Sequence, residues 1–166
     1  RQVPLYFDFY LNPTTGVRLQ GVIDRVDWKA DVFRVLDYKT GVAETKIKSI
    51  ASLFDRTITR RNKTAFQVLF YAWLFYHKGM DYVTFPVSQE KVSAMPGLFN
   101  TRQIFNTHFD PRFFFSQAGN STDKPIEDIA KHQNEWEEGL QAMLTELLDP
   151  AVPFMQTDDD TRCTLC

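Results

Sequence analysis

The sequence lacks several features that would place it outside the class of ordinary globular domains. With only two cysteines among 166 residues, it does not have the composition of a disulfide-rich secreted domain. Its net charge of −2 excludes a polybasic segment that binds nucleic acid by charge alone. No stretch of about 18 apolar residues is present, so no transmembrane helix is expected. No signal-peptide pattern is found at the start, and these absences together favour a reducing, cytoplasmic location.

The residues that are present can build a sizeable core. Hydrophobic residues make up 43% of the chain, which contains 15 Phe, 6 Tyr and 3 Trp. We expect one domain over residues 1–150, followed by an acidic tail over residues 151–166 that ends in Cys163-x-x-Cys166. Because the sequence starts with Arg1 and ends within a cysteine motif, we expect the N-terminal part of this domain to be missing.

The apolar pattern predicts several strands and two long helices. Alternation indicates strands at 3–11, 17–28 and 33–40, the last two forming a hairpin. Helical spacing indicates a first helix that starts at a cap at Asn62 or Thr64 and ends at Lys78-Gly79, and a second helix over 125–148. Between them we expect strands at 82–87 and 102–109, separated by a turn at Pro96-Gly97. This order predicts an α/β fold with a mixed central β-sheet flanked by helices.

Two acidic residues of the predicted hairpin are candidates for a metal site. If residues 29–32 form its loop, the antiparallel register places Asp24 opposite Asp37 and Val22 opposite Lys39. Two carboxylates at that distance repel each other unless a cation lies between them, and a divalent cation beside Lys39 could activate a water molecule. An exposed hairpin with ordinary alternating charges is the alternative. The apolar residues that flank both aspartates favour the metal site.

A second candidate element lies on the first predicted helix. Gln67 and Tyr71 are four residues apart, so their side chains point the same way. A polar residue at the edge of the core and an amphipathic core tyrosine are the alternative interpretation.

Three motifs in this order resemble the RecB-type branch of the PD-(D/E)xK nuclease superfamily. They are the segment 21–27 (GVIDRVD), the segment 37–41 (DYKTG) and Gln67-x-x-x-Tyr71. The resemblance extends from Gly21 to about Tyr76 and implies a restriction-endonuclease-like core. It also implies that Gln67 and Tyr71 support the catalytic site and approach the DNA backbone.

The resemblance implies a role for each residue of the second motif and for the first aspartate. Asp24 and Asp37 would bind Mg²⁺ or Mn²⁺, the backbone carbonyl of Tyr38 would complete the metal's coordination, and Lys39 would assist the attacking water. The implied activity is metal-dependent hydrolysis of phosphodiester bonds in DNA. One departure from the family pattern is visible. Relatives usually carry a further His or Glu ligand on a helix before the first motif, whereas the only acidic residue before Gly21 is Asp8.

The cysteine motif at the end has three interpretations. The AddB-type helicase-nuclease subunits and the CRISPR-associated RecB-like exonucleases follow the nuclease core with Cys-x-x-Cys and another Cys, which with an upstream Cys hold a [4Fe–4S] cluster. Cys163 and Cys166 match part of that pattern, and no complete cluster can form with two cysteines. Half of a zinc site and a tail without a metal are the other interpretations.

The function implied by the resemblance is that of an exonuclease domain in a helicase-nuclease of DNA repair or recombination. Its partners would be DNA, expected to be single-stranded, and a helicase domain or subunit, with no membrane involved. The alternative is a catalytically inactive domain of the same fold that binds DNA or scaffolds a helicase-nuclease complex. A free-standing metal-binding module built on Cys163 and Cys166 ranks last. The presence of Asp24, Asp37 and Lys39 together favours activity, because a repelling carboxylate pair has no structural benefit of its own.

Overall fold

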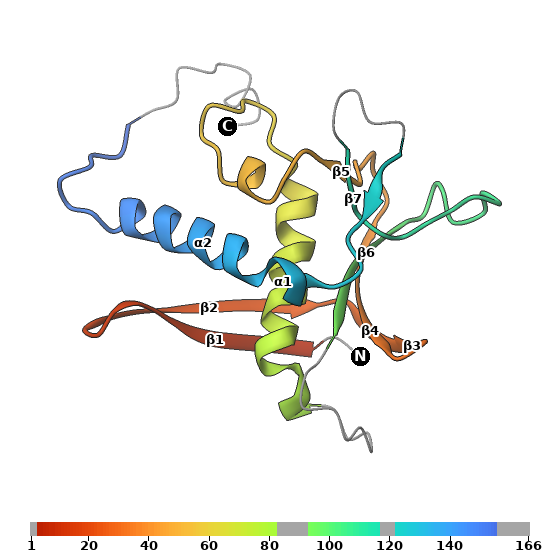
Figure 1. Cartoon of the computed structure of the whole chain (residues 1–166), viewed down its shortest axis with the longest axis horizontal. Helices are drawn as coiled ribbons and strands as arrows, with labels where there is room; N and C mark the ends of the chain where they lie inside the picture. Colours follow the sequence, from red (N-terminus) through yellow and green to blue (C-terminus); the bar gives the residue numbers. More distant parts are fainter. Residues whose placement is uncertain (1–2, 83–92, 117–121, 156–166) are drawn as a thin grey trace.

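The computed structural model describes residues 3–82, 93–116 and 122–155 (Figure 1). The strands are β1 (Val3–Asn12), β2 (Thr15–Ile23), β3 (Arg25–Lys29), β4 (Val32–Lys39), β5 (Lys46–Ile47), β6 (Ala94–Asn100), β7 (Phe114–Phe115) and β8 (Lys124–Pro125). The helices are α1 (Lys63–Lys78) and α2 (Gln133–Leu147), with 3₁₀ turns η1 (Ala51–Leu53), η2 (Gly79–Tyr82) and η3 (Ile129–His132). The paired strands are β1-β2, β3-β4-β6 and β5-β7-β8, and β4 runs parallel to β6 but antiparallel to β3. This arrangement of mixed sheets and helices confirms the expected fold class.

Helix α1 occupies the centre of the molecule and forms the largest part of the core (Figure 1). It begins where the sequence predicts, because the Asn62 side chain accepts a hydrogen bond of 2.9 Å from the Ala65 N–H. It ends at Lys78, also as predicted, with two basic side chains in its last turn. Its buried side chains pack against the β1–β2 hairpin and against β4 and β6. They are Ala65, Val68, Leu69, Ala72, Trp73, Leu74 and Phe75.

A polar network joins α1 to α2. The Glu137 carboxylate lies 3.0 Å from each of three nitrogens, the indole N–H of Trp73, Nε2 of His77 and the amide of Gln133. Because the side chain of Trp73 is fully buried, this carboxylate satisfies a donor that water cannot reach. None of the helices in the described ranges is long and apolar enough to span a membrane.

Three expected elements are wrong. Residues 102–109 form consecutive turns rather than a strand, and the strand beside β4 is β6, which contains Pro96 and Gly97. Pro96 is tolerated because β6 lies at the edge of the β3-β4-β6 sheet. At Gly97 a Cβ would lie 2.6 Å from Leu36 Cδ2, so glycine allows Leu36 to pack closely. The second helix begins at Gln133, after η3, rather than at Pro125. Most of the strand expected at 82–87 lies outside the described residues.

Candidate active site

The hairpin of β3 and β4 has the predicted register over most of its length. Trp28 pairs with Phe33, and the pairing continues to Arg25 opposite Leu36. Only Ala30 and Asp31 form the loop, and both have positive φ, as a two-residue hairpin turn of type I′ requires.

The predicted continuation of that pairing is wrong. Asp24 occupies a bend between β2 and β3, and Val22 pairs with Pro4 of β1 rather than with Lys39. The chain leaves one sheet and enters the other at Asp24, which interrupts the strand predicted over 17–28. Asp24 nevertheless reaches β4, because its Oδ2 accepts a hydrogen bond of 3.2 Å from the backbone N–H of Tyr38.

Asp37 is the buried carboxylate of the site, with 3% of its surface exposed. The Lys39 ammonium lies 2.8 Å from Asp37 Oδ2, yet no donor in the described residues makes a well-formed hydrogen bond to that oxygen. Burial raises the pKa of the Asp37 carboxyl above its ordinary value, Lys39 opposes the rise, and the nearby charge of Asp24 adds to it. A buried carboxylate that is paired with one lysine and lies near a second carboxylate leaves a net negative charge that a cation would stabilise.

The three sequence motifs are connected by direct contacts. Lys39 Nζ donates a hydrogen bond of 3.1 Å to Gln67 Oε1, and Gln67 Nε2 donates one of 3.0 Å to the Tyr71 hydroxyl. The Tyr71 ring lies against the backbone of Gly21, where a Cβ would be 2.6 Å from Tyr71 Cε1. Gly21 is therefore the residue that allows the Tyr71 ring to approach β2. The structure thus brings the residues of all three motifs into one continuous set, and helix α1 connects β2 with β4.

Asn100 is a site neighbour that the sequence did not reveal. It is 3% exposed, it stands opposite Lys39 in the β4–β6 pairing, and its amide donates a hydrogen bond of 3.0 Å to the Gly41 carbonyl. The Thr101 N–H donates one of 3.0 Å to the Lys39 carbonyl. These bonds fix the end of β4 at which Asp37 and Lys39 lie. Asn100 could have been found as the polar residue that follows the apolar segment 94–99. It was missed because a turn, not a strand, was expected at Pro96-Gly97.

The donor set is compatible with Mg²⁺ or Mn²⁺. Asp24 and Asp37 supply carboxylate oxygens, and Mg²⁺ is commonly held by one or two carboxylates together with water and substrate phosphate. Within the described ranges no group of three or more His, Cys, Asp or Glu side chains could hold a metal, so no third protein ligand of these types joins the pair. The Tyr38 carbonyl as a ligand stays a prediction. Cys163 and Cys166 lie outside the described residues.

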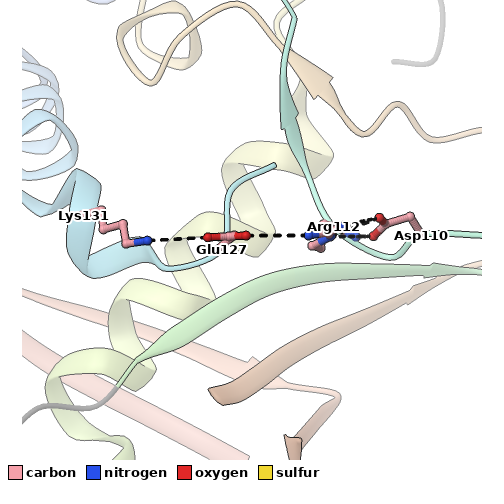
Figure 2. Close-up of polar contacts among 4 residues, drawn as sticks. All are labelled: Asp110, Arg112, Glu127 and Lys131. Atoms are coloured by element: carbon pink, nitrogen blue, oxygen red, sulfur yellow. Dashed lines mark hydrogen bonds and ion pairs between the residues drawn. The ribbon is translucent and has the colours of Figure 1, made fainter. Parts of the chain in front are cut away.

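A cavity of about 410 Å³ lies near the opposite end of β4, where Val32 and Arg34 line it. Three of its lining side chains, Arg112, Glu127 and Lys131, belong to a row of ion pairs that continues to Asp110 (Figure 2). Arg112 lies 2.6 Å from Asp110 and 3.9 Å from Glu127, which in turn lies 3.6 Å from Lys131. Because these acids are matched by bases, this cavity does not have the electrostatics of a divalent-cation site. At the other end of β4, Asp24 and Asp37 are two carboxylates beside the single base Lys39.

Two carboxylates and a lysine at the carboxyl end of a strand define a candidate site for metal-assisted hydrolysis. A family model of the PD-(D/E)XK nuclease superfamily matches residues 1–166, and the chain belongs to this superfamily. The fold is consistent with the restriction-endonuclease-like core of that superfamily. Comparison with curated proteins and with solved structures found no significant match.

Proposed function

We propose that the chain is a Mg²⁺- or Mn²⁺-dependent deoxyribonuclease that uses the site at Asp24, Asp37 and Lys39. Membership of the superfamily suggests a nuclease and implies DNA binding. The observation that carries the proposal is the buried carboxylate of Asp37, whose Oδ2 lacks a well-formed hydrogen bond and has Lys39 2.8 Å away. Two carboxylates beside a single lysine leave a net negative charge at a largely buried position, which favours a role in binding a cation.

Each residue of the site has a chemical role in this proposal. A divalent cation held by Asp24 and Asp37 would supply Lewis-acid polarisation of a phosphoryl oxygen. Lys39 would position the attacking water and stabilise the negative charge that develops on the phosphate. Gln67 and Tyr71 would act as positioning residues, because their hydrogen bonds determine where the Lys39 ammonium lies.

The finer assignment is the exonuclease domain of a RecB/AddB-type helicase-nuclease in DNA repair or recombination, acting on single-stranded DNA from a helicase partner. The order of the three motifs supports it, and the contacts among them are those that such a site needs. A [4Fe–4S] cluster completed by Cys163 and Cys166 together with other cysteines belongs to the same proposal, as does a cytoplasmic location. The catalytically inactive alternative has one observation in its favour, the lack of a third ligating side chain within the described part of the chain.

The experiment is cleavage of end-labelled DNA with Mg²⁺ or Mn²⁺ by the unmodified chain, Asp37→Ala and Lys39→Ala. We expect Asp37→Ala to abolish cleavage and metal binding while the fold is retained. Lys39→Ala should preserve metal binding, measured by titration calorimetry, and slow cleavage by about 10²-fold or more, the usual loss for removing one group that stabilises transition-state charge. Undiminished metal-dependent cleavage by Asp37→Ala would refute the site. Metal binding without cleavage by the unmodified chain would favour the inactive alternative.

A further inference from the structure

The segment 101–109, which follows β6, projects from the body of the molecule (Figure 1). It starts beside the candidate active site, because Asn100 is paired with Lys39 and the Thr101 N–H donates to the Lys39 carbonyl. Phe105, in the middle of this segment, has a side chain that is 91% exposed, and its neighbour Ile104 is 38% exposed. A phenylalanine exposed to this extent offers a free ring face to a partner close to the catalytic edge.

The segment is held in a defined shape. The N–H groups of Gln103 and Ile104 donate to the Asn100 carbonyl at 2.9 and 3.1 Å, and the Asn100 side chain accepts from the Arg102 N–H at 3.0 Å. Near its other end, the Phe109 ring packs on Phe99 with centroids 5.5 Å apart. A loop ordered in this way presents its tip with little entropy left to lose on binding.

The charge of the segment matches a polyanion. Residues 101–109 contain Arg102 and His108 but no Asp or Glu. On β4 the Tyr38 ring, 43% exposed, contacts Phe99 with centroids 5.7 Å apart, on the sheet face opposite to Asp37 and Lys39. An exposed phenylalanine and an arginine in a segment without an acidic residue have the chemistry of surfaces on which single-stranded nucleic acid lies.

We propose that Phe105 stacks on an unpaired base of the DNA strand that is cleaved at the adjacent site, while Arg102 contacts its phosphate backbone. This proposal rests on the nuclease function proposed above and adds the contact that holds an unpaired strand beside Lys39. Stacking requires an open base face, which an unpaired strand offers along its length and a duplex does not. The loop therefore selects single-stranded DNA.

The test compares the affinity of Phe105→Ala and of the unmodified chain for a fluorescent oligothymidylate, by anisotropy without divalent metal so that no cleavage occurs. Loss of one stacked base should weaken binding between about 5-fold and about 150-fold, and Phe105→Trp should retain it. Phe154→Ala is the matched control, because Phe154 is also an exposed phenylalanine (87%) but lies in the segment after α2. An abasic oligomer of the same length should bind Phe105→Ala and the unmodified chain equally.

The outcomes separate this proposal from the one on which it rests. Equal binding of oligothymidylate by Phe105→Ala and the unmodified chain overturns the stacking contact alone, and would direct attention to a protein partner for the loop. Equal weakening on the abasic strand also overturns it, because the loss would then be structural. Arg102→Gln should lower the slope of log affinity against log salt by about 1. Failure of the unmodified chain to bind any DNA overturns both proposals.

Discussion

Replacing the buried carboxylate of Asp37 by an amide should make the variant more stable than the unmodified chain without metal. With metal bound, the unmodified chain should be the more stable of the two. Asp37→Asn conserves size and removes the charge from a side chain that is 3% exposed. Opposite charges 2.8 Å apart, the distance from Lys39 Nζ to Asp37 Oδ2, attract by roughly 6 kcal/mol at an effective dielectric constant of about 20. Burying a carboxylate loses several kcal/mol of hydration. The pKa of Asp37 is raised because lost hydration, together with the repulsion of Asp24, exceeds the attraction of Lys39.

The net effect is therefore modest and has a definite sign. We expect Asp37→Asn to gain about 1 kcal/mol in free energy of unfolding without metal, a size common among stabilising substitutions. For a chain of this length that gain raises Tm by about 2–4 °C. A cation at about 100 times its Kd stabilises the unmodified chain by about 2.7 kcal/mol, which is about 5–11 °C, and should not stabilise the variant.

The assay is thermal unfolding of both proteins with EDTA and with a series of Mn²⁺ concentrations. Asp27→Asn is the matched control, because it makes the same chemical change on β3. The Asp27 carboxylate accepts bonds of 2.6 and 2.8 Å from Arg34, so this control should lose stability with EDTA and keep its gain with Mn²⁺. The reasoning is refuted if Asp37→Asn unfolds at a lower temperature than the unmodified chain in EDTA. An equal gain of both proteins with Mn²⁺ would show that Asp37 is not a ligand.

Two further predictions concern stability. Gly97→Ala should lower the free energy of unfolding by about 1–3 kcal/mol in a denaturant titration, because the added Cβ would crowd the buried Leu36. Gly41→Ala is the control and should be neutral, because no other side chain or backbone atom of the described residues lies within 4 Å of the Cβ it adds. A loss of stability in Gly41→Ala would contradict the packing argument. Burial lowers the pKa of His77 below its ordinary 6.5, with Glu137 opposing, so the unfolded chain binds this proton at higher pH than the folded one. The stability that comes from burying His77 in its neutral form should be complete above about pH 6.5 and decline as the pH falls below that value. Urea titrations over this pH range should show the decline in the unmodified chain and not in a His77→Gln variant.

The parts of the fold that the sequence predicted correctly are those coded by neighbouring residues. The cap at Asn62 and the basic end at Lys78 lie on α1 itself, so both ends of the helix were predicted. The turn of the β3–β4 hairpin is likewise local, and it fixed the pairing from Trp28–Phe33 to Arg25–Leu36. Membership of the superfamily was also predictable, because its motifs are short strings of adjacent residues.

The errors arose where distant residues override local preference. Pro96 and Gly97 have the chemistry of a turn, but their place in the sheet depends on the pairing with β4. On the outer side of β6 the described part of the chain makes only an isolated bridge, between Gly97 and Arg112, so Pro96 can lie in this edge strand. The hydrogen bond from Lys39 to Gln67 joins residues 28 positions apart and has no local signal. Motif order could therefore name these residues, whereas their contacts required the packing of α1 on the sheets.

The bend at Asp24 explains why helix α1 matters to the site as much as the carboxylates do. β2 belongs to one sheet and β3 to another, so the position of Asp24 relative to β4 depends on how the two sheets are held together. α1 contacts both, since Tyr71 lies on Gly21 of β2 and Gln67 accepts from Lys39 of β4. The Gln67–Tyr71 hydrogen bond links these two contacts within one turn of helix. The spacing of the carboxylates, and with it the fit to a cation, is therefore determined by a helix that supplies no ligand itself.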